Sequence, residues 1–267
     1  MRRLAFRVPA ADKESVLDAV LPLLPAGVHE DEGDEWVELS SFAGALPSRA
    51  ALEAAAGPLG DWSEEDVPAD WRERRSRFGG GGALVRDRLL IRSPWDPPAG
   101  DGVVDVVVER RGSAFGSGSH PTTQMCAALM LDLPPAGGAA DLGCGVGTLA
   151  IAAAKLGWAP VVAVDRVPVA IEVARENVER NGVAVECAVA DLAADDVPLA
   201  ALLLVNAPPP VHERVAAALT DEVRHIVISG IVTGEAEAVL AGYRAAGCAV
   251  GEALGTEDEW IAVHLTR

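Results

Sequence analysis

The sequence predicts an α/β protein in which a doubly wound sheet of about seven strands follows a smaller α+β domain. The chain has 267 residues, which suits two domains better than one. From about residue 101 onward, apolar stretches of strand length alternate with helical stripes, a pattern typical of a parallel sheet covered by helices on both faces. The residues before 71 follow the order strand, helix, strand, strand, helix, strand, which is the ferredoxin-like order.

The N-terminal domain, residues 1–70, is predicted from periodicity and from turn residues. Residues 11–24 place their apolar side chains on one helical face. The acidic stretch 30–34 is predicted as a turn, and Ser48 is expected to cap a helix that Gly57 ends. The predicted elements are, in order, a strand at 2–8, a helix at 11–24, a strand region around 36–39, the helix after Ser48, and a strand at 62–67.

Residues 71–100 are predicted as a linker, because Gly79-Gly-Gly-Gly82 is flexible and marks a hinge. Strands are expected at 83–91 and 103–108, and the domain at 101–267 then alternates strands with helices. Its further predicted strands are 139–142, 161–164, 183–190, 202–205, 226–229 and 260–265. Its predicted helices are 125–133, 149–156, 169–180, 213–219 and 235–246.

Composition and charge exclude several classes of function. Hydrophobic residues make up 50% of the chain, so it can bury a core and is not expected to be disordered. No apolar run reaches the roughly 18 residues that span a bilayer, and no signal peptide is found, so we expect a cytoplasmic protein without a membrane partner. The four cysteines show no metal-ligand spacing, which disfavours zinc and disulfides. A net charge of −18 disfavours duplex nucleic acid and favours a basic partner.

A glycine turn follows the predicted strand at 139–142. In Gly143-Cys-Gly-Val-Gly147 the missing Cβ atoms let the backbone approach a ligand at a strand-to-helix junction. Asp165 ends the next strand about 20 residues later, where a carboxylate can accept hydrogen bonds from both hydroxyls of a ribose. Asp141 is a candidate for the amino-acid end of S-adenosylmethionine (AdoMet), and Asp191 for its adenine. The acidic residue suits AdoMet and NAD alike, although the glycine spacing departs from the nicotinamide fingerprint.

A second glycine-rich loop favours AdoMet. The segment Phe115-Gly-Ser-Gly-Ser-His-Pro-Thr-Thr123 leads into a predicted helix. Together with the turn at 141–147, it closely resembles the PrmA family, the methyltransferases of large-subunit ribosomal protein eleven, which carry Phe-Gly-Thr-Gly-x-His-Pro-Thr-Thr. The resemblance covers most of the chain. Further matches are Asn177, Asn181-Gly182, Ser229-Gly-Ile231 and Glu259-Trp260.

The resemblance implies an AdoMet-dependent protein N-methyltransferase with the Rossmann-like sheet of class I methyltransferases. Its substrate would be a basic large-subunit ribosomal protein, methylated on lysine and/or N-terminal amines and gripped by the ferredoxin-like domain. We expect the enzyme to be a monomer. The residues expected to bind the cofactor or to shape its loop are Phe115, Ser117, His120, Thr122, Thr123, Asp141, Gly143, Gly145, Asp165, Asp191 and Asn206.

Asn206 is the candidate catalytic residue. It follows an apolar run at 202–205, and ligands of such sheets bind at the carboxyl ends of the strands. Its amide offers one acceptor and two donors, so it can hold the hydrogens of a neutral amine. A lysine acceptor, with an unperturbed pKa of about 10.4, must first lose a proton. His120 is expected to order its loop, and His212 is expected to be structural or at the surface.

Two departures from the family pattern bear on the substrate. The family usually has Asn-Ile-Leu where this chain has Asn206-Ala-Pro-Pro-Pro210, and Asp-Pro is common where Arg110-Arg111 stands. The three prolines fix φ and stiffen the lip of the acceptor site. The alternatives are methylation of another protein or of a small molecule, a nicotinamide-dependent oxidoreductase, and a catalytically silent AdoMet-binding module.

Overall fold

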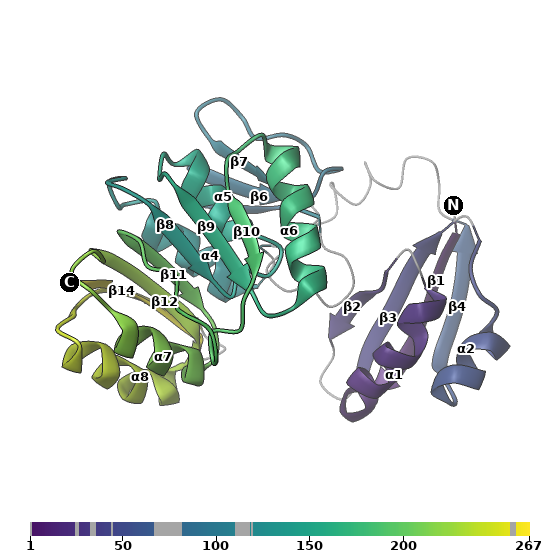
Figure 1. The fold of residues 1–267 in the computed structure, drawn as a ribbon. Coiled ribbons are helices and arrows are strands. Elements are labelled where there is room, and N and C mark those ends of the chain that lie inside the picture. The colour runs from purple at the N-terminus through teal and green to yellow at the C-terminus, as the bar shows by residue number, and fades with distance from the viewer. Residues whose placement is uncertain are drawn as a thin grey trace. The chain divides into compact units, whose positions relative to one another are not determined.

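The protein is described from a computed structural model, at residues 2–24, 27–32, 36–43, 45–66, 82–109, 118, 120–256 and 260–267. The chain divides into two compact units, Met1–Gly79 and Gly80–Arg267 (Figure 1). Most of the glycine run and the basic stretch before it lie outside the described residues. Of the helices within those ranges, none has the length and apolarity needed to cross a membrane.

The N-terminal unit is a four-stranded antiparallel sheet with two helices on one face (Figure 1). Its strand order is β2-β3-β1-β4, which is the ferredoxin-like order, so the fold predicted for this unit is confirmed. Its elements are β1 (Arg2–Pro9), η1 (Ala10–Asp12), α1 (Lys13–Val20), η2 (Leu21–Leu23), β2 (His29–Glu32), β3 (Trp36–Ala43), α2 (Arg49–Ala56) and β4 (Gly60–Asp66).

Alternating side chains on the two central strands build the core of this unit. Leu4, Phe6 and Val8 of β1 are buried beside Val37 and Leu39 of β3. Because successive side chains of a strand point to opposite faces, these five lie on the face that α1 and α2 cover.

Local capping follows the prediction, whereas one turn does not. The Ser48 hydroxyl accepts a hydrogen bond from the amide of Ala51 at 3.3 Å and caps α2. Gly57 ends the helix with φ +82°, a backbone conformation that residues with a Cβ rarely adopt. The acidic turn predicted at 30–34 is wrong at its start, because β2 continues to Glu32 and pairs with β3. Such a short acidic edge strand has no apolar alternation to reveal it.

The C-terminal unit is built around a seven-stranded sheet with the order β10-β9-β8-β11-β12-β14-β13. Strands β8 to β12 pair in parallel, while β14 runs antiparallel between β12 and β13. The five parallel strands and the closing pair confirm the predicted fold class. The elements are α4 (Pro121–Met130), β8 (Ala139–Leu142), α5 (Thr148–Lys155), β9 (Val161–Asp165), α6 (Pro168–Asn181), β10 (Glu186–Val189), β11 (Leu202–Asn206), α7 (Pro209–Ala218), β12 (His225–Val232), α8 (Thr233–Ala245), β13 (Ala249–Gly255) and β14 (Trp260–Thr266).

Helices cover both faces of this sheet. Buried residues of α4, α5 and α6 form one apolar cluster with the sheet, and those of α7 and α8 form another on the opposite face (Figure 1). In β11, Leu202 and Leu204 belong to the first cluster, and Leu203 and Val205 belong to the second. The strand is therefore apolar at every position up to Asn206, as expected for a strand buried on both faces.

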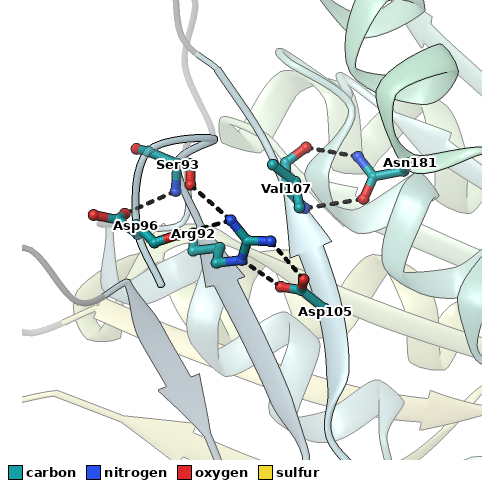
Figure 2. Close-up of polar contacts among 6 residues, drawn as sticks. All are labelled: Arg92, Ser93, Asp96, Asp105, Val107 and Asn181. Carbon is teal, nitrogen blue, oxygen red and sulfur yellow. Dashed lines mark hydrogen bonds and ion pairs between the residues drawn. The ribbon is translucent and has the colours of Figure 1, made fainter. Parts of the chain in front are cut away.

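A three-stranded sheet made of β5 (Ala83–Val85), β6 (Leu89–Arg92) and β7 (Val104–Val107) completes the unit. Figure 2 shows the Arg92 guanidinium on the Asp105 carboxylate, with two contacts of 2.7 Å that join β6 to β7. The same figure shows the Asn181 side chain of α6, which accepts from the Val107 amide at 2.9 Å and donates to its carbonyl at 2.6 Å. These contacts fix β7 to α6.

Several predicted boundaries differ from the structure, among them the start of α4, at Pro121 instead of residue 125, and the following three. The strand predicted at 83–91 is divided by a turn at Arg86 and Asp87, whose φ angles are +47° and +53°. Helix α7 begins at Pro209 instead of residue 213, because proline is well placed in the first turn of a helix. Strand β12 continues to Val232, past an irregularity at Gly230, which has φ +79°.

Candidate active site

The glycine turn after β8 is built from left-handed backbone. Gly143, Gly145 and Gly147 have φ angles of +84°, +52° and +84°, which residues with a Cβ rarely adopt. The amides of Gly143 and Cys144 donate to the carbonyl of Val164 in β9 at 2.8 and 2.9 Å. The turn is therefore held against the neighbouring strand and presents backbone at the carboxyl edge of the sheet.

Asp165 ends β9 beside this turn. Its Oδ2 accepts a hydrogen bond from the amide of Gly145 at 2.9 Å, and its Oδ1 accepts one from the amide of Val167 at 2.9 Å. The carboxylate thus joins the turns that follow β8 and β9. Each carboxylate oxygen has a further lone pair with which it can accept from a ligand.

Asp141 lies in β8, under the glycine turn, and is 1% exposed. Its Oδ2 accepts a hydrogen bond from the amide of Ala150 in α5 at 3.0 Å. Burial raises the pKa of Asp141 to about 7, against the lowering effect of the Ala150 amide and with a smaller raising effect from the charge of Asp165. A cation bound nearby would favour the charged carboxylate and bring this pKa down again.

A hydrogen-bonded chain crosses from β11 to the start of α4. Nδ2 of Asn206 donates to Oγ1 of Thr122 at 3.2 Å, and this Oγ1 lies 2.7 Å from Nδ1 of His120. The same Nδ1 accepts from the amide of Thr122 at 3.3 Å, so it carries no hydrogen and receives the threonine hydroxyl as well. Oγ1 of Thr122 must then be the acceptor for Asn206. This fixes the amide of Asn206 with Nδ2 toward Thr122 and leaves Oδ1 as an acceptor for a ligand.

A pocket lies among these groups. Oγ1 of Thr123 is buried there and has no hydrogen-bond partner among the described residues. Buried polar atoms are nearly always hydrogen-bonded, so this atom indicates a polar ligand. The residues that line the pocket are Thr123, Asp141, Gly143, Cys144, Gly145, Thr148, Leu149 and Asn206.

Most of the described residues predicted for the site converge on this pocket. Those that line it are Thr123, Asp141, Gly143, Gly145 and Asn206, and those hydrogen-bonded to them or to one another are Asp165, Thr122 and His120. Asp191 is exposed and is not among the lining residues; its Oδ1 accepts from the amide of Ala193 at 3.0 Å. Phe115 and Ser117 lie outside the described residues, as do Arg110 and Arg111.

Asn177 supports the site through hydrogen bonds to two segments of the backbone. Its match to the family pattern does not by itself predict this role. Asn177 is fully buried in α6, and its Nδ2 donates to the carbonyls of Glu109 and Val146, both at 3.0 Å. Its Oδ1 accepts from the amide of Glu109 at 2.9 Å. One side chain therefore ties the glycine turn to the chain that leaves β7. A buried asparagine inside a helix is the signal that could have revealed it.

His212 is a second supporting residue, buried in α7. Its Nε2 lies 2.9 Å from the carbonyl oxygen of Ala207 and 3.0 Å from that of Ser229, and its Nδ1 lies 3.1 Å from the hydroxyl of Tyr243. Because carbonyls only accept, Nε2 carries the hydrogen and Nδ1 accepts from the tyrosine. Burial lowers the pKa of His212, which favours this neutral form. Nothing in the spacing of the histidines pointed to this contact.

A family model and two relatives that match this chain carry the same name. The family model described as Ribosomal protein L11 methyltransferase (PrmA) matches residues 70–267. A ribosomal protein L11 methyltransferase of Bordetella bronchiseptica is 32% identical, over 96% of this chain and 90% of that protein. One of Pelotomaculum thermopropionicum is 34% identical, over 97% of this chain and 82% of that protein.

A solved structure supports the fold. The ribosomal protein L11 methylase of Lactobacillus delbrueckii subsp. bulgaricus superposes with a TM-score of 0.59 and 24% identity, over 70% of this chain and 97% of that one. The resemblance seen in the sequence and the prediction of an AdoMet-dependent methyltransferase are both confirmed. The chain therefore belongs to the ribosomal protein L11 methyltransferase (PrmA) family and is an AdoMet-dependent methyltransferase.

Proposed function

We propose that this chain transfers methyl groups from AdoMet to lysine and/or N-terminal amines of ribosomal protein L11. One observation carries the proposal: the left-handed glycine turn and the oriented amide of Asn206 line the same pocket. A site for an activated methyl donor thus adjoins an acceptor for amine hydrogens. The choice of L11 is supported by the names of the relatives.

The pocket fits AdoMet in its chemistry. The glycine turn leaves room for close approach of the ligand to the backbone, and Oγ1 of Thr123, which has no partner among the described residues, can bond to a polar atom of the ligand. The buried carboxyl of Asp141 suits the ammonium of the cofactor's amino-acid end, and the second lone pairs of Asp165 suit its ribose hydroxyls. Phe115, Ser117 and Asp191 stay predicted contacts. When bound, AdoMet supplies a methyl group already activated by its sulfonium.

The work left to the protein is positioning. An amine attacks through its lone pair, so a lysine must be bound in its neutral form. Oδ1 of Asn206 accepts one amine hydrogen. The hydrogen bonds from Asn206 through Thr122 to His120 prevent the side-chain amide from flipping by half a turn. Orientation of the reacting groups can lower a barrier by about 7–11 kcal/mol, so a fixed amide that orients the amine supports catalysis by positioning.

We assign recognition of the protein substrate to the N-terminal unit. Every described residue predicted to bind the cofactor lies in the C-terminal unit, which leaves the ferredoxin-like unit without a part in cofactor binding. The net charge of −18 supports a basic protein as substrate and disfavours duplex nucleic acid. We further propose that the enzyme acts as a monomer in the cytoplasm.

Transfer of a labelled methyl group tests this function. The purified chain is incubated with methyl-tritiated AdoMet and either purified L11 or lysate proteins depleted of L11. Label that enters L11 only with enzyme supports the proposal. Label that enters another protein or a small molecule instead would support the alternative acceptor. AdoMet binding by calorimetry without label in any fraction would mean a silent binding module.

A further inference from the structure

Ala207, the residue that follows Asn206, is held from three sides. The amide of Ala207 donates to the carbonyl of Ser229 at 3.1 Å, and the carbonyl of Ala207 accepts from Nε2 of His212 at 2.9 Å. A Cβ on Gly230 would lie 2.5 Å from the nitrogen of Ala207 and 2.7 Å from its oxygen, so the two backbones touch. The conformation of Ala207 is therefore set by its neighbours in β12 and α7.

His212 is itself fixed in place. The hydroxyl of Tyr243, a fully buried residue of α8, donates to Nδ1 of His212, and the two rings meet at 71° with centroids 6.0 Å apart. The first turn of α7 is stiff, because Pro208, Pro209 and Pro210 have restricted φ angles and no amide hydrogens. The imidazole thus connects the carbonyl of Ala207 to two helices, α7 and α8, that hold it in a fixed position.

We propose that His212 is a positioning residue for methyl transfer. Its neutral imidazole holds the Ala207 carbonyl and, through the adjoining peptide, sets the direction of the Asn206 amide in the pocket. This inference rests on the proposed function, in which Oδ1 of Asn206 orients the acceptor amine. A displacement of about 1 Å at a reacting group can cost up to roughly a hundredfold in rate, so a small shift of this peptide matters.

A positioning role for His212 and a role in packing alone predict different effects of its loss on turnover. The imidazole lies within hydrogen-bonding distance of both the Ala207 carbonyl and the Ser229 carbonyl, and the Ser229 carbonyl also accepts from the amide of Ala207. Loss of the imidazole therefore leaves the Ala207 carbonyl without this hydrogen bond and removes a donor to the Ser229 carbonyl, the acceptor for the peptide amide that follows Asn206. The glycine turn and Asp165 stay in place. Turnover should change, and affinity for AdoMet should not.

The test compares His212→Leu and His212→Gln with Val215→Ala. Val215 is buried in the same helix and its side chain has no polar atom that could hydrogen-bond to the Ala207 carbonyl, so its truncation reports loss of packing. For His212→Leu we expect kcat on L11 to fall by about tenfold or more, with the Kd for AdoMet within about threefold of wild type. His212→Gln retains a donor near the place of Nε2 and should recover much of this loss. Val215→Ala should lower the melting temperature and leave kcat unchanged.

Hydrogen–deuterium exchange of the Ala207 amide gives a readout that needs no substrate. It should be faster in His212→Leu and close to wild type in Val215→Ala. If His212→Leu does not fold, Tyr243→Phe keeps the imidazole but removes its tyrosine partner, and a drop in kcat at unchanged AdoMet Kd is expected. Wild-type kcat in His212→Leu, or in a folded Tyr243→Phe when His212→Leu does not fold, would overturn the inference. If the wild-type enzyme labels no L11 but Ala207 exchange still depends on His212, the proposed function fails and the positioning contact stands.

Discussion

Replacement of Asp165 by alanine should weaken AdoMet binding by more than tenfold and leave the fold intact. The carboxylate receives hydrogen bonds from the amides of Gly145 and Val167, both at 2.9 Å. Its removal releases the glycine turn on one side of the pocket and removes the acceptor proposed for the ribose hydroxyls. Val167 is 40% exposed, so its amide can bond to water instead.

The magnitude follows from these bonds. A hydrogen bond to a charged group contributes about 1.5–3 kcal/mol, and about 1.4 kcal/mol corresponds to a tenfold change in Kd. Loss of a single ribose contact is thus enough for the predicted effect, and loosening of Gly145 adds to it. For folding, only the partly buried Gly145 bond counts, so the free energy of unfolding should fall by about 1–2 kcal/mol.

Calorimetric titration with AdoMet measures the effect, and circular dichroism with thermal melting checks the fold. Asp132→Ala is the matched control, because Asp132 is a half-exposed carboxylate of the same unit that pairs with Arg86 and Arg88. Its AdoMet affinity should equal that of wild type. A folded Asp165→Ala protein with a Kd within about twofold of wild type would refute the assignment of Asp165 to the cofactor.

Three further results are expected. Because burial raises the pKa of Asp141 to about 7, the free protein is protonated there at lower pH, and a bound cation should release that proton. AdoMet affinity should thus rise with pH from about 5 to 7 and then level off, and Asp141→Asn should abolish the rise in calorimetry. Asn206→Asp should slow methyl transfer at least about tenfold near neutral pH, with partial recovery at higher pH, because the added charge favours the protonated, unreactive amine. Wild-type turnover in both Asn206→Asp and Asn206→Ala would show that the amine is held by other residues. A chain that starts at Ala83 should bind AdoMet nearly normally but fail to methylate L11, and full activity of that folded fragment would remove the recognition role.

The parts of the site that the sequence revealed depend on short-range patterns. Glycines in a strand-to-helix turn, an acid at the end of the next strand, and an amide after a fully apolar run each follow from local geometry. Gly143, Gly145, Asp165 and Asn206 were identified in this way, and the structure brings them together. The alternation of strands and helices likewise predicted the sheet and both of its faces.

The parts that the sequence did not reveal depend on contacts between distant segments. Asn177 bonds to the backbone of Glu109, which lies 68 positions away in the sequence. Tyr243, the partner of His212, lies 31 positions after it. Neither pair has a spacing that a periodic pattern can show. The acidic sequence of β2 predicts a turn, because the pairing of this strand with β3 depends on backbone hydrogen bonds and not on an apolar pattern. Contacts of Phe115 and Ser117 with the cofactor stay predictions.

The most direct test of nitrogen methylation at this pocket is mass spectrometry of L11 after incubation with AdoMet and enzyme. The wild-type enzyme should place methyl groups on lysine side chains and/or the N-terminal amine, and Asn206→Ala should place at least about tenfold fewer. Methyl groups found on oxygen or carbon, or an L11 that stays unmodified although the enzyme binds AdoMet, would contradict the account.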